Sequence, residues 1–127
     1  MHYLTLQEVL RLHFQIIEDY GGTHGIRDEG RIKSVIAAPA QEVFGQDQYP
    51  TVFEKAAVYA RNIIADHAFV DGYKRTGITV MGIFLARDNY KLTATATELE
   101  DFAVKIAVEH LSIQDIADWL KCHTQIL

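Results

Sequence analysis

One run of ten residues, His67 to Thr76, concentrates the polar groups that could carry chemistry in this chain. It reads His-Ala-Phe-Val-Asp-Gly-Tyr-Lys-Arg-Thr and lies between an alanine-rich helical segment and an apolar one. The run therefore marks a helix–loop–helix junction. The first turn of the second helix would present unpaired backbone N–H groups, the positive end of the helix dipole and two cations together, which suits phosphate.

The residue types in this run suit the transfer of a phosphoryl or nucleotidyl group. His67 can act as a general base, because imidazole titrates near neutral pH. Asp71 can hold Mg²⁺, a hard cation that prefers carboxylate, water and phosphate oxygens. Gly72 lets the backbone approach phosphates closely, and Lys74 and Arg75 can neutralise phosphate charge.

Taken singly, the same residues have simpler interpretations that remain open. His67 can be a partly buried histidine at a helix end, and Asp71 can merely cap the following helix. Lys74 and Arg75 can form a solvated first turn, although cations at that position oppose the helix dipole and favour a bound anion.

Six helical segments must position the run. Apolar residues recur at helical spacing along most of the chain. The segment from Thr76 to Arg87 is apolar nearly all round, which predicts a central, buried helix. Residues 41–49 are expected to form a loop, and Leu92 a short extended stretch. The expected helices begin after Thr5, after Asp28, at Pro50, within the run itself, after Thr95 and after Ser112.

Composition indicates one all-α domain covering residues 1–127, with 49% hydrophobic and 23% charged residues. The net charge of −5 gives no footprint for non-specific nucleic-acid binding, so the local cations are interpreted as a ligand site. No apolar run reaches membrane-spanning length, and no secretory signal is evident at the N-terminus. Cys122 is the only cysteine, which fits a reducing compartment, so a cytoplasmic location is expected.

Outside the run, the polar residues indicate structural roles. His13 lies on the apolar stripe of the first helix and is expected at the edge of the core, and the other histidines lack the spacing of zinc ligands. Glu8 is expected on a solvated helix face. For Arg27, Asp28 and Arg31 an ion pair within the loop is the default expectation.

The pattern His-x-Phe-x-Asp-Gly-x-Lys-Arg-Thr resembles the motif of the Fic/Doc family, and it is closest to the short death-on-curing (Doc) branch. The segments Gly25-Ile26-Arg27-Asp28-Glu29-Gly30 and Tyr49-Pro50-Thr51-Val52-Phe53-Glu54-Lys55-Ala56-Ala57 also resemble that branch, as do the length and the helical layout. The resemblance implies a compact single-domain Fic/Doc helical bundle that acts as the toxin of a toxin–antitoxin pair.

The resemblance also implies roles for single residues. His67 would be the base and Asp71 the metal ligand, and with Arg75 they would form the catalytic set. The residues implied to surround the nucleotide phosphates are Gly72, Tyr73, Lys74, Arg75 and Thr79. ATP and Mg²⁺ are the implied cofactors, and the implied partner is a cognate antitoxin that lays a helix into a groove of the toxin.

Two positions separate the reactions known within the family. Most Fic members transfer AMP and have a glycine where this chain has Lys74 and a second arginine where it has Ile78. The Doc branch has lysine at the first place and lacks that arginine. The resemblance therefore implies transfer of the γ-phosphoryl group to a threonine of elongation factor Tu, which would block translation, with AMP transfer as the alternative.

Tyr73 and Thr79 depart from the pattern, because the Doc branch has asparagine at both places. A tyrosine replaces a compact amide by a bulky ring with one hydroxyl, and at a tight helix start that ring can fill the phosphate site or push the loop outward. Tyr73 is therefore predicted to reduce or abolish catalysis. A catalytically inactive, antitoxin-binding module is the second alternative, whereas the acidic net charge gives a DNA-binding regulator little support.

Overall fold

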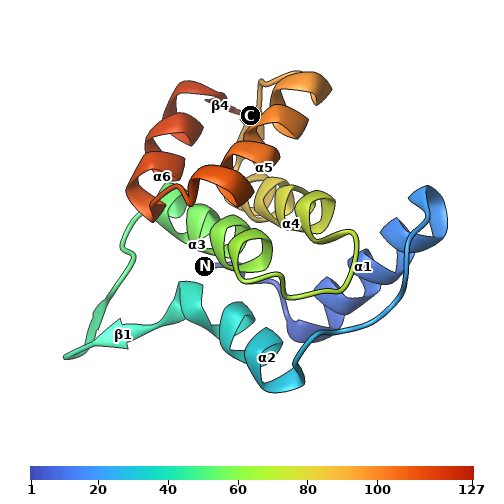
Figure 1. Cartoon of the computed structure of the whole chain (residues 1–127). Coiled ribbons are helices and arrows are strands. Elements are labelled where there is room, and N and C mark those ends of the chain that lie inside the picture. Colours follow the sequence, from blue (N-terminus) through green and yellow to red (C-terminus); the bar gives the residue numbers. More distant parts are fainter.

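The computed structural model describes residues 1–127, and it is built from six α-helices with two short two-stranded ribbons. The helices are α1 (Leu6–Tyr20), α2 (Glu29–Ala37), α3 (Val52–Ala65), α4 (Tyr73–Arg87), α5 (Ala96–Glu109) and α6 (Ile113–Cys122). Helices α3 and α4 lie side by side at the centre, with α1 and α2 on one side and α5 and α6 on the other (Figure 1). The all-α expectation is thereby confirmed.

The central position of α3 and α4 follows from their composition. On α3 the side chains of Ala56, Ala57, Tyr59 and Ile63 are entirely buried, and α4 contributes a fully buried stripe that includes Phe84. Helix α4 is the central, buried helix that the apolar run predicted, and it extends to Tyr73. No helix combines the length and the apolar character that crossing a membrane requires.

Close packing between α3 and α4 depends on Gly77. A Cβ at this position would lie 2.6 Å from Cγ1 and 2.9 Å from Cδ1 of Ile64, which is nearer than van der Waals contact allows. We expect Gly77→Ala to lower the free energy of unfolding by about 2 kcal/mol, because overpacking costs up to about 3 kcal/mol and the gain in helix propensity returns only about 1 kcal/mol. Urea denaturation measures the difference.

Gly82 provides the matched control on the same helix. A Cβ there would meet only Cδ1 of Leu92, at 3.3 Å, the far end of a flexible side chain. Gly82→Ala should therefore leave stability unchanged or raise it by up to about 1 kcal/mol. Equal effects of the two substitutions would contradict the packing argument.

The helix starts are mostly those the sequence predicted. Thr5, Asp28, Thr95 and Ser112 are N-caps whose side chains accept a hydrogen bond from the backbone three residues later. The third helix was expected to begin at Pro50, and this was wrong: it begins at Val52, with Thr51 as its cap. Asp28 is thus a cap and takes no part in an ion pair within the loop; its side chain accepts from the backbone of Arg31.

Of the two short antiparallel ribbons, the first was not predicted and the second was predicted only in part. Residues 41–49 were expected to be a loop, but β1 (Glu42–Val43) pairs there with β2 (Gln46–Asp47). The connecting Phe44 and Gly45 both have positive φ, 53° and 77°, as a tight hairpin turn requires. The expected extended stretch at Leu92 is strand β3 (Tyr90–Leu92), which pairs with β4 (Thr124–Ile126) near the C-terminus. A single turn of 3-10 helix, η1 (Ala38–Ala40), joins α2 to the first ribbon.

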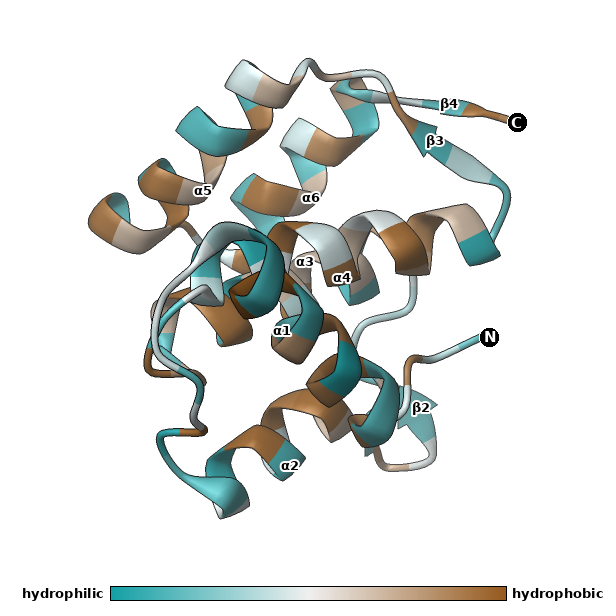
Figure 2. Cartoon of the chain, turned by 90° about the vertical axis from the view of Figure 1, so that its right-hand side faces the viewer, coloured by the Kyte–Doolittle hydropathy of each residue, from teal (hydrophilic) through white to brown (hydrophobic).

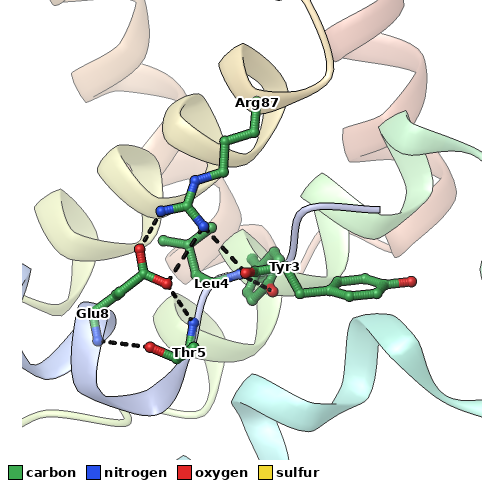
Figure 3. Close-up of polar contacts among 6 residues, drawn as sticks. Tyr3, Leu4, Thr5, Glu8 and Arg87 are labelled. Carbon is green, nitrogen blue, oxygen red and sulfur yellow. Dashed lines mark hydrogen bonds and ion pairs between the residues drawn. The ribbon is translucent and has the colours of Figure 1, made fainter.

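Glu8 was expected on a solvated face, and the structure corrects this. Figure 3 shows its carboxylate paired with the guanidinium of Arg87 at the end of α4. The same carboxylate accepts from the backbone N–H of Thr5 at 3.0 Å, which completes a capping box, and Arg87 also donates to the carbonyl of Tyr3 at 3.1 Å. The pair therefore ties the start of α1 to the end of α4.

This pair predicts a pH-dependent contribution to stability. Hydrogen bonding to Arg87 and then to the Thr5 backbone lowers the pKa of Glu8 from 4.5 to about 2. The contribution is therefore complete above pH 4.5 and disappears as the pH falls towards 2. We expect about 1 kcal/mol, since both side chains are about one-third exposed and water screens them.

Glu8→Gln tests this dependence, because glutamine can keep the capping box but has no charge. The difference in free energy of unfolding between the parent protein and Glu8→Gln, followed by chemical denaturation, should be largest near neutral pH and vanish near pH 2. A difference that does not change with pH would contradict the assignment.

Candidate functional site

The run that suggested chemistry forms the junction between α3 and α4, as expected. Residues 66–72 are the connecting loop, and the remainder is the first turn of α4. His67 has a positive φ of 47°, which turns the chain sharply after α3. Ala68 and Phe69 are then buried, and Gly72, with φ of 72°, serves as the N-cap of α4. Ala68 and Phe69 thus anchor the loop in the core, whereas His67 and Asp71 on either side of them remain partly exposed.

The backbone N–H groups in the first turn of α4 have no side-chain cap and can therefore bind an anion. The N-cap, Gly72, has no side chain, so no side-chain hydrogen bond satisfies the N–H groups of this turn. Lys74 and Arg75 are exposed, and neither is paired with a carboxylate. The cationic Cζ of Arg75 lies 3.7 Å from the centre of the Tyr20 ring. The first turn of α4 therefore carries both uncapped backbone donors and cations that no carboxylate neutralises.

His67 is half-buried, and its imidazole stacks on the ring of Tyr73. The ring centres are 4.3 Å apart and the planes differ by 26°. Nζ of Lys74 lies 5.2 Å from the centre of the same tyrosine ring. Tyr73 is therefore in contact with the candidate base and close to a candidate phosphate-binding cation.

Asp71 does not cap α4, so that simpler interpretation was wrong. Its Oδ2 accepts a hydrogen bond of 2.8 Å from the backbone N–H of Thr23, in the loop after α1. The other carboxylate oxygen has no hydrogen-bond partner in the chain. Mg²⁺ is usually held by only one or two carboxylates and completes its shell with water and phosphate oxygens. One free carboxylate oxygen beside a cationic helix start fits that requirement.

A cavity of about 520 Å³ opens at this helix start. One wall is the α4 side, which includes Ile78. The other wall is α5, which contributes Leu99, Glu100, Ala103 and Val104. The C-terminal half of this helix is largely apolar and brown in Figure 2. The candidate site residues that line the cavity are Asp71, Gly72, Tyr73, Lys74, Arg75 and Thr79. His67 is not part of the lining, whereas Tyr73, whose ring stacks on His67, is.

Thr79 lies in the cavity wall with its hydroxyl already engaged. The hydroxyl donates to the backbone carbonyl of Arg75, one helical turn earlier, at 2.8 Å. It can still accept hydrogen bonds, but its proton is not free for a phosphate oxygen. Of the residues proposed to surround phosphate, Thr79 is therefore the one with the least to donate.

Sequence reasoning missed the residues that shape the site from other elements. The α5 wall, Tyr20 beside Arg75 and Thr23 beside Asp71 are all distant from the run along the chain. Spacing within the sequence carries no signal for such contacts. The only available signal was the segment around residue 25 that resembles the Doc branch, which lies just after Thr23.

Comparison with known proteins identifies the family to which this chain belongs. Residues 3–85 match the family model described as the Fic/DOC family. The chain belongs to the Fic/Doc family.

Two Doc proteins are similar to this member of the Fic/Doc family over most of its length. "Toxin Doc" of Mycolicibacterium smegmatis is 32% identical over 100 residues, which cover 77% of each chain. "Protein kinase doc" of Escherichia phage P1 is 30% identical over 121 residues, 95% of this chain and 94% of the relative. The resemblance read from the motif is thereby confirmed.

Proposed function

We propose that this protein is a Doc-type toxin that transfers the γ-phosphoryl group of ATP to a threonine hydroxyl of elongation factor Tu. The observation that carries the proposal is the cavity at the start of α4, which is lined by Asp71, Lys74 and Arg75 and lies at a helix start whose backbone donors have no side-chain cap. The similarity to a phage protein named a kinase supports the same chemistry. Transfer to this target would stop translation, and the cytoplasm is where the toxin would act.

The chain's own residues divide the work as follows. His67 accepts the proton of the attacking hydroxyl, and its half-buried ring keeps one face against Tyr73. Lys74 and Arg75, with the N–H groups of the α4 start, bind and orient the phosphates. Asp71 would hold Mg²⁺ through its free oxygen. When bound, the ion would neutralise phosphate charge and so ease departure of ADP, the leaving group of γ-phosphoryl transfer.

Ile78 favours phosphoryl transfer over AMP transfer. It lines the cavity at the place where most AMP-transferring relatives carry a second arginine. An apolar side chain cannot neutralise a further phosphate, so the cationic groups of the cavity are confined to the first turn of α4. Lys74, in the place of the glycine of those relatives, adds a point charge within that turn.

The second candidate is a catalytically inactive module that binds a cognate antitoxin. The contact between Tyr73 and His67 favours it, because the ring restricts approach to the candidate base. In both cases the antitoxin would dock a helix in a groove of this protein. A small reading frame directly upstream of the gene would identify that partner.

Incubation of elongation factor Tu with α-labelled or γ-labelled ATP and Mg²⁺ tests the proposal. We expect the γ label alone to reach the target, at a low rate with the parent protein, and none to reach it with Asp71→Asn. Transfer of the α label would identify AMP transfer instead. No transfer of either label, together with a tight antitoxin complex, would identify the inactive module.

A further inference from the structure

His13, on helix α1, contacts the loop that carries Asp71. Its side chain is 5% exposed, and its Nε2 lies 2.8 Å from the backbone carbonyl oxygen of Asp71. A carbonyl oxygen can only accept a hydrogen bond, so Nε2 must carry the proton. The position at the core edge that the sequence suggested is therefore only part of its role.

The ring of His13 is held in a fixed orientation. It stacks on Phe69, which is fully buried, with ring centres 3.8 Å apart and planes within 8°. Because the carbonyl oxygen of Asp71 can only accept, this contact requires a proton on Nε2 whether the ring carries one proton or two.

The loop lies directly on α1 around this contact (Figure 1). A Cβ at Gly72 would come within 2.9 Å of Cδ1 of Ile17 and 3.7 Å of Nε2 of His13. Asp71 is thus held at two points: its carbonyl accepts from His13, and its Oδ2 accepts from the N–H of Thr23. Together these bonds fix the peptide plane after Asp71 and the direction of its carboxylate.

We propose that His13 is a positioning residue for Asp71. His13 acts by donating its Nε2–H to the backbone carbonyl of Asp71. The contribution to metal binding rests on the proposed function, in which Asp71 holds Mg²⁺. Without this donor, the peptide between Asp71 and Gly72 can rotate, and the free carboxylate oxygen no longer has one direction. Groups that orient a metal ligand in this way commonly change metal affinity by about 10- to 100-fold.

A matched pair of substitutions separates the hydrogen bond from the packing. In His13→Gln the terminal amide N–H can occupy the place of Nε2–H, whereas His13→Met has similar length and no donor. In the ligand-free protein we expect the Thr23 amide to exchange its hydrogen about tenfold faster in His13→Met, and at the parent rate in His13→Gln. Parent rates in both variants, or equal acceleration in both, would overturn the inference.

A measurement on the parent protein guards against a variant that fails to fold. Nuclear magnetic resonance of the His13 ring nitrogens should show the proton on Nε2 at neutral pH. A proton found only on Nδ1 would overturn the inference without any substitution.

Mg²⁺ titration of ATP binding then tests the link to the metal. We expect the Mg²⁺ midpoint to rise about tenfold in His13→Met and to stay near the parent value in His13→Gln. A midpoint unchanged in His13→Met would overturn the role in metal binding. If the parent protein binds no Mg²⁺ and ATP, the proposed function fails, while the exchange rates still decide whether His13 positions Asp71.

Discussion

Replacing Tyr73 by asparagine is expected to raise the rate of phosphate transfer to elongation factor Tu at least about tenfold, the change that 1.4 kcal/mol of barrier produces. In the parent protein the tyrosine ring stacks on His67, the candidate base, and lies near the ammonium of Lys74. Asparagine removes the ring from both and leaves the cavity lining otherwise unchanged. Transfer of γ-label from ATP, measured under single-turnover conditions, gives the comparison.

Tyr73→Phe is the control that distinguishes the ring from the hydroxyl. Phenylalanine keeps the stacking surface against His67 and loses only the polar group, so its rate should stay at the level of the parent protein. A rise as large as that of Tyr73→Asn would assign the effect to the hydroxyl. Equal rates in the parent and both variants would contradict any inhibitory role of residue 73.

Removal of the candidate base should have the largest effect of all. In the Tyr73→Asn background, His67→Ala is expected to lower the transfer rate about 10²- to 10⁴-fold, the usual contribution of a positioned general base. ATP affinity should change little, because His67 does not line the cavity. Single-turnover rates and a separate nucleotide-binding titration measure the two quantities.

His2→Ala serves as the matched control, since His2 is exposed and lies in a different part of the surface, next to Tyr3 and Arg87. It should leave both rate and affinity unchanged. A small loss of rate in His67→Ala, or a loss explained wholly by weaker ATP binding, would remove His67 from the role of base.

The parts of the fold that the sequence predicted are those set by local chemistry. The N-caps at Thr5 and Thr95 bond to residues three positions away, and each belongs to a capping box, so the pattern is visible within four residues. The apolar residues on nearly all sides of α4 likewise predict its central position. The start of α3 was misplaced by two residues because Pro50 and Thr51 both suit a helix start, and only the observed cap distinguishes them.

The parts that escaped prediction depend on contacts between distant residues or on unusual backbone. Glu8 and Arg87 are 79 positions apart, and nothing in the spacing connects them. The first ribbon has strands of only two residues and a turn at Phe44, a residue type that rarely takes positive φ. The candidate site follows the same division. The motif from His67 to Thr76 identified the residues of the candidate site, but the direction of the Asp71 carboxylate depends on Thr23, 48 positions away.

The contact between Arg75 and Tyr20 has a consequence for the entropy of binding. A free arginine side chain at a helix start samples many rotamers, and ordering it around a ligand costs up to about 2 kcal/mol. Here the guanidinium already rests against the ring of Tyr20, and no hydrogen bond within the chain occupies its N–H groups. An anion arriving at the start of α4 thus meets a guanidinium whose rotamers are already restricted by its contact with Tyr20. Tyr20, which does not line the cavity, would in this way strengthen anion binding without touching the anion.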